Sequence, residues 1–76
     1  MEKQYDNYLL QIKKIATAEI SEVIGLSEDM VRKYKTGRNL PPLDRAVLLN
    51  QRYSIPYEFW VTHNIKYKIK SQLKLW

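Results

Sequence analysis

Residues 32–38 read RKYKTGR and carry four cationic side chains with no acid among them. Guanidinium and ammonium groups are the donors that proteins use to bind phosphates and other anions, so this cluster is well equipped to contact a polyanion. A second run of cations occupies residues 65–76, also without an acid: Lys66, Lys68, Lys70 and Lys74. Charge alone leaves a solubilising surface equally open.

The whole chain of 76 residues is basic, because 13 Lys and Arg face eight Asp and Glu, for a formal net charge of +5. Its acids gather upstream of the cationic cluster, at Glu19, Glu22, Glu28 and Asp29. A one-sided basic surface of this kind favours a polyanionic partner.

Other chemistries find no support in the residue types. No paired carboxylates, nucleophile–base set or phosphate-cradling glycine loop appears, so we expect neither an enzyme nor a cofactor. The chain has no cysteine, and His63 lacks the cluster of ligands that a metal site needs. No apolar run approaches the ~20 residues that span a bilayer. The first residues lack the pattern of a secretion signal, so we expect no membrane partner and a cytoplasmic location.

The elements that must position the cationic cluster are helices. Apolar residues at three- and four-residue spacing predict a helix over about residues 4–15. Thr17 is expected to cap a second helix, and Gly25 to end it in the left-handed conformation. Ser27 is expected to cap a third helix, which Gly37 ends. The cationic cluster therefore begins within this third helix.

Two further helices are predicted downstream. The apolar spacing returns at Leu43 and predicts a fourth helix that ends near Arg52. Ser54 is expected to cap a short fifth helix, with Pro56 near its start. Together these elements predict an all-α domain over residues 4–63.

The tail, residues 64–76, changes period. Apolar and lysine residues alternate from Ile65 to Leu75, which predicts a half-buried strand with the lysines on its wet face. A lone strand has exposed edges, so pairing with a second copy of the chain is expected. A helical stripe of Ile65, Ile69, Leu73 and Trp76 is the alternative.

Two short helices joined at a glycine form a helix-turn-helix layout, in which one helix crosses the DNA backbone and the other enters the major groove. The chain resembles the helix-turn-helix domains of phage repressors and Cro proteins over about residues 5–62. The matching positions are Ile20, Ser21, Gly25, Leu26, Ser27, Val31, Tyr34, Gly37, Pro41 and the Ile55-Pro56…Trp60 close. The resemblance implies a compact five-helix fold that binds a DNA operator, usually as a homodimer, in a bacterial or phage-infected cell.

On this resemblance, residues of about 27–36 form the recognition helix. Base contacts are expected from Ser27, Glu28, Asp29, Arg32 and Lys33. Phosphate contacts are expected from Thr17, Lys35, Thr36, Arg38 and Asn39. Arg32 and Lys33 suit guanine O6 and N7, whereas Glu28 and Asp29 either accept from cytosine amino groups or serve as helix-terminal charges. The expected dimer contacts are Ile65, Tyr67, Ile69, Leu73 and Trp76.

Two classes of function compete at this point. The cationic cluster at residues 32–38 favours a sequence-specific DNA-binding transcriptional regulator on a palindromic operator. Glu28 and Asp29 repel phosphates and favour a protein-binding module, such as an antitoxin-like partner with weak DNA binding. RNA binding has less support, because the chain lacks a basic, aromatic-rich strand of a four-stranded sheet.

Overall fold

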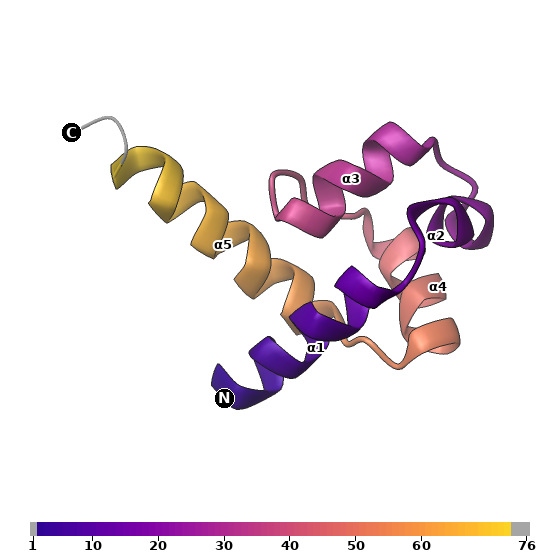
Figure 1. Ribbon diagram of the computed structural model, residues 1–76, viewed down its shortest axis with the longest axis horizontal. Coiled ribbons are helices and arrows are strands. Elements are labelled where there is room, and N and C mark those ends of the chain that lie inside the picture. The colour runs from indigo at the N-terminus through magenta and orange to yellow at the C-terminus, as the bar shows by residue number, and fades with distance from the viewer. Residues whose placement is uncertain (1, 74–76) are drawn as a thin grey trace.

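The computed structural model describes residues 2–73, and this range contains five helices and no strand (Figure 1). The helices are α1 (Glu2–Lys14), α2 (Thr17–Ile24), α3 (Glu28–Thr36), α4 (Leu43–Tyr53) and α5 (Tyr57–Leu73). The predicted all-α, five-helix fold is therefore confirmed.

The apolar stripes of all five helices meet in one core. Helix α2 packs on α3 and α4, and α5 packs on α1, α3 and α4. Burying such stripes is the main source of stability for short helices like these. The buried apolar side chains are Ile12, Ile20, Ile24, Val31, Tyr34, Ala46, Leu49, Ile55, Phe59 and Trp60.

Aromatic contacts fasten α1 to the start of α5. The Tyr5 ring stacks on Phe59 with centroids 5.4 Å apart, and the Tyr8 ring meets Phe59 edge-on at 5.8 Å. Phe59 in turn meets Trp60 edge-on at 5.0 Å. Pairs of this geometry add to the stabilisation that burial alone provides. The first helix is thus held against the last.

The strand predicted for the tail is wrong as far as the described residues reach. Residues 65–73 continue α5, which is 17 residues long rather than short, and its outer part projects beyond the other helices (Figure 1). A lone strand would leave its backbone N–H and C=O groups without partners, whereas a helix pairs them within the segment. Lys, Gln and Leu also favour helix over strand. Trp76 lies outside the described residues.

Two predicted caps are also wrong. Ala16, with extended backbone angles and no capping side chain, precedes α2, and Thr17 is the first helical residue. Only Ile15 and Ala16 separate α1 from α2, so the connection is complete before the threonine. Ser54 ends α4 in the left-handed conformation (φ 59°) instead of starting α5, and its N–H donates to the Asn50 carbonyl at 2.8 Å.

The buried face of α4 is narrower than its apolar spacing predicts. Ala46 and Leu49 are buried, whereas Leu43 and Val47 remain exposed. The exposed pair lies on the surface of the bundle and contributes little to the core.

Candidate nucleic-acid interface

The turn between α2 and α3 has the geometry that the sequence predicts. Gly25 adopts the left-handed conformation (φ 70°), and its N–H donates to the Ser21 carbonyl at 2.9 Å. The Ser21 hydroxyl donates to the Leu26 carbonyl, which ties the turn to α2. Ser27 then caps α3 by accepting a hydrogen bond from the Met30 N–H at 3.3 Å. These bonds fix the direction in which α3 leaves the turn.

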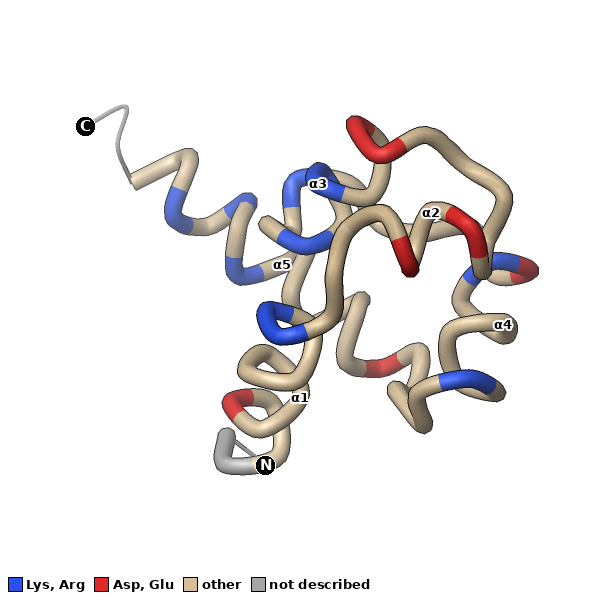
Figure 2. Tube along the Cα trace, turned by 45° about the vertical axis from the view of Figure 1, so that its right-hand side comes forward, with Lys and Arg blue, Asp and Glu red and all other residues tan. Residues whose placement is uncertain are grey.

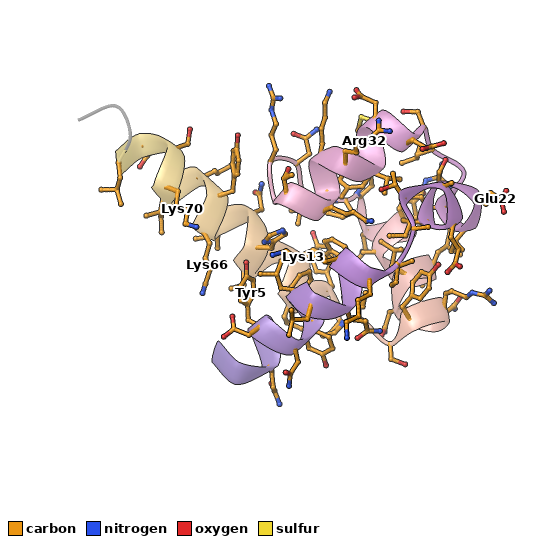
Figure 3. The ribbon with its side chains drawn as sticks, viewed as in Figure 1. Tyr5, Lys13, Glu22, Arg32, Lys66 and Lys70 are labelled. Carbon is orange, nitrogen blue, oxygen red and sulfur yellow. The ribbon has the colours of Figure 1, made fainter. Side chains whose placement is uncertain are left out.

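Helix α3 separates a buried face from an exposed one. Val31 and Tyr34 are buried in the core, while Ser27, Arg32 and Thr36 are exposed. The side chain of Arg32 projects from the outside of the bundle in Figure 3. A helix placed in this way can present one face to a partner without disturbing the core.

Ion pairs neutralise the first turns of the exposed face. Arg32 lies 3.6 Å from Glu28, and Lys33 lies 3.6 Å from Asp29, each one helical turn apart. The acids that argued against DNA binding are therefore matched by cations on the same helix. Exposed pairs of this spacing are weak, so an incoming phosphate or base edge can replace them.

The five residues predicted to contact bases all lie on α3 or at its cap, so the structure brings Ser27, Glu28, Asp29, Arg32 and Lys33 together. The predicted phosphate residues are more scattered. Thr36, Arg38 and Asn39 follow one another at the end of α3, whereas Thr17 is half-buried at the start of α2.

Lys35 has a different environment from the other cations of α3. Its ammonium donates to the Ile15 carbonyl, between α1 and α2, and burial lowers its pKa below the ordinary value of lysine. The bond satisfies a carbonyl at the end of α1 and ties α3 to that corner. Because of this bond, the role of Lys35 in the folded chain is structural.

Backbone bonds order the segment after α3. Gly37 takes the left-handed conformation (φ 87°), and its N–H donates to the Tyr34 carbonyl at 3.1 Å. The Asn39 N–H and the Thr36 hydroxyl both donate to the Lys33 carbonyl, at 3.3 and 3.1 Å. Arg38 thus projects from a defined turn.

Helix α5 holds this turn in place. The buried Asn64 amide donates to the carbonyls of Gly37 at 2.8 Å and Arg38 at 3.3 Å. Gly37 lies so close to α5 that an added Cβ would approach the His63 carbonyl oxygen to 2.7 Å. This role of His63 and Asn64 was not predicted from the sequence. Their position one turn after the buried Phe59 and Trp60 was the available signal.

His63 joins three helices through its ring. Nε2 lies 2.6 Å from the Lys35 carbonyl, which only accepts, so this nitrogen carries the proton. Nδ1 therefore accepts from the Tyr5 hydroxyl at 2.7 Å. Burial lowers the pKa of His63, the bond to the Lys35 carbonyl opposes this, and the charges of Lys13 and Lys66 lower it further. His63 is accordingly a neutral structural side chain.

Charges of both signs occur over the surface, with cations most frequent at the end of α1, on α3 and along α5. Figure 2 shows Lys and Arg there and on α4, while Asp and Glu mark α2, the start of α3 and single positions on α1, α4 and α5. A basic surface formed by separate helices offers a polyanion several contact points at once.

The exposed part of α5 bears the predicted dimer contacts other than Trp76, which lies outside the described residues. Ile65, Ile69 and Leu73 are 50%, 52% and 65% exposed. They recur every fourth residue and form one apolar stripe along the helix. Tyr67 lies off this stripe and is 36% exposed.

No family model matches the chain, and comparisons with curated proteins and with solved structures found no match. Between residues 2 and 73, no helix combines the length and apolar character needed to cross a membrane. In the same described part of the chain, no group of His, Cys, Asp and Glu is arranged to hold a metal ion.

Proposed function

We propose that the chain is a sequence-specific DNA-binding transcriptional regulator that inserts α3 into the major groove. The observation that carries this proposal is the packing of α3 on α2 across a hydrogen-bonded turn. A left-handed glycine joins them, a serine caps α3, and the outer face of α3 stays exposed. An exposed, rigidly positioned helix with cations towards its end matches what major-groove recognition requires.

The proposed regulator is a homodimer that acts in the cytoplasm of a bacterial or phage-infected cell. The apolar stripe of Ile65, Ile69 and Leu73 supplies a self-complementary surface, because two α5 helices can pack these residues against each other. A two-fold dimer would read a palindromic operator, with its half-sites about one helical turn apart.

Selection from a pool of random DNA tests the proposal. The pure protein is expected to enrich duplexes that share a palindromic motif. Recovery of sequences no more alike than the starting pool, in buffer of low ionic strength, would refute sequence-specific binding.

A protein-binding role is the second candidate, and the same apolar stripe favours it. If the stripe contacts a different protein, the chain would resemble an antitoxin-like partner that binds DNA weakly. The two roles differ in solution: the regulator alone forms a dimer, whereas a binding module for another protein remains monomeric until that protein is added.

A further inference from the structure

A hollow of about 520 Å³ lies between the end of α3 and the outer part of α5. Arg38 and Asn39 line it from the turn after α3, and Asn64 and Lys68 line it from α5. No Asp or Glu is among the described residues that line it. The other lining residues are apolar or aromatic: Met30, Tyr34, Leu40 and Pro42. The Asn64 amide N–H groups already bind the Gly37 and Arg38 carbonyls, so the donors left in the hollow are Arg38, Asn39 and Lys68. Two cations and an amide are donors that bind a phosphate.

The two cations reach this hollow because α5 is a helix. Lys68 follows Asn64 by four residues, so both side chains lie on the same face of α5. Asn64 in turn binds the carbonyls of Gly37 and Arg38, which fixes the turn that bears Arg38 against α5. In a strand, the four residues from Asn64 to Lys68 would span about 13 Å instead of the about 6 Å of a helix, so Lys68 would lie farther from the turn that Asn64 binds.

We propose that Lys68 joins Arg38 and Asn39 in binding one phosphate of the DNA backbone beside the major groove. The inference rests on the proposed function and deepens it, because it adds a residue outside the helix-turn-helix to the DNA-binding surface. Like other phosphate contacts, Lys68 would position the protein on the duplex without reading its sequence.

A second copy of the chain is a poorer occupant of the hollow. A two-fold contact would bring the Arg38 and Lys68 of both copies towards one another, and like charges at an interface are unfavourable. The hollow offers no acidic side chain to offset them. Charge complementarity therefore selects a phosphate.

Lys70 provides a matched control on the same helix. It is exposed, two residues beyond Lys68, and does not line the hollow. It follows Lys66 by four residues and so shares the face of α5 on which the Lys66 ammonium lies 4.2 Å from the centre of the Tyr5 ring (Figure 3). Lys68→Gln and Lys70→Gln remove the same charge from opposite sides of the helix.

The test measures the binding of the full chain to a fluorescent duplex of random sequence of about 20 base pairs, titrated between about 50 and 200 mM salt. Lys68→Gln is expected to reduce the slope of log K against log salt by about 0.9 for each protomer bound, and hence by about 1.8 for the proposed dimer, with Lys70→Gln unchanged. Arg38→Gln is expected to resemble Lys68→Gln.

Three results would overturn this inference. Equal slopes for Lys68→Gln, Lys70→Gln and the unaltered chain would show that Lys68 does not contact DNA. Equal reductions in both variants would show a general effect of charge. A change of sedimentation mass in Lys68→Gln would assign the hollow to an interface between copies. In contrast, failure of the unaltered chain to bind any duplex would refute the proposed function itself.

Discussion

Arg32 and Arg38 test the division between base and phosphate contacts. Both are exposed, but Arg32 lies on the outer face of α3 and Arg38 on the turn that follows it. Arg32→Ala is expected to relax the preference at one base pair of each half-site and to weaken specific binding by about 1–3 kcal/mol. Arg38→Ala is expected to weaken binding to all duplexes alike. Anisotropy with selected and random duplexes measures both, and identical behaviour of the two variants would contradict the assignment.

Substitution by alanine is expected to lower the free energy of unfolding by different amounts at the two glycines. Both have positive φ, but a Cβ at Gly25 meets nothing within 4 Å, whereas one at Gly37 would meet the His63 carbonyl oxygen at 2.7 Å. Gly25→Ala should cost about 1–2 kcal/mol through its backbone conformation. Gly37→Ala should cost about 2–5 kcal/mol because the clash adds to this. Urea unfolding measures both, and a smaller loss at Gly37 would show that α5 does not hold the turn.

The lowered pKa of His63 predicts that acid destabilises the fold. Because its pKa is lower in the folded chain than in the unfolded one, the unfolded state binds the proton more readily. The free energy of unfolding should stay constant above about pH 6.5, the ordinary pKa of histidine, and fall as the pH drops below it. His63 is the only histidine in the chain, so His63→Gln serves as the control. Equal free energies of unfolding in urea above and below this pH would contradict the prediction.

At the scale of elements, local signals predicted the turn between α2 and α3 and the two ends of α3. Ser27, Gly25 and Gly37 act through bonds to residues three or four positions away, so sequence alone could place them. The prediction of a strand for the tail failed because its period was ambiguous: apolar residues stand at every second position except Ser71, and Ile65, Ile69 and Leu73 also recur every fourth. The packing of Phe59, Trp60, His63 and Asn64 on the bundle starts a helix that the tail continues. The anchoring of α3 by α5 spans more than 25 residues of sequence, which no local pattern reports.

The apolar stripe of α5 predicts how the proposed dimer responds to substitution. Ile69 is 52% exposed, so Ile69→Lys should leave the fold intact and weaken self-association at least about tenfold. Ser71 is exposed and lies off the stripe, which makes Ser71→Lys the matched control. Sedimentation velocity distinguishes the two. Dimers that survive both substitutions would mean that copies associate through another surface.

At the scale of the whole molecule, the charges are distributed so that one region can face a polyanion. The paired residues of the first turns of α3 contribute little net charge, while Arg38 and Lys68 add positive charge beyond them. Binding that depends on such a surface releases the counterions of DNA, so salt must oppose it. The helical fold of the tail strengthens this expectation, because it places Lys68 beside the end of α3.

The salt dependence of operator binding is the most direct test of the claim that this surface holds DNA. A dimer that makes about 6–10 phosphate contacts should lose about 10³–10⁵ in affinity for the selected duplex between 50 and 200 mM salt. The loss should appear as a straight line of log K against log salt. An affinity that barely changes across that range would contradict the account.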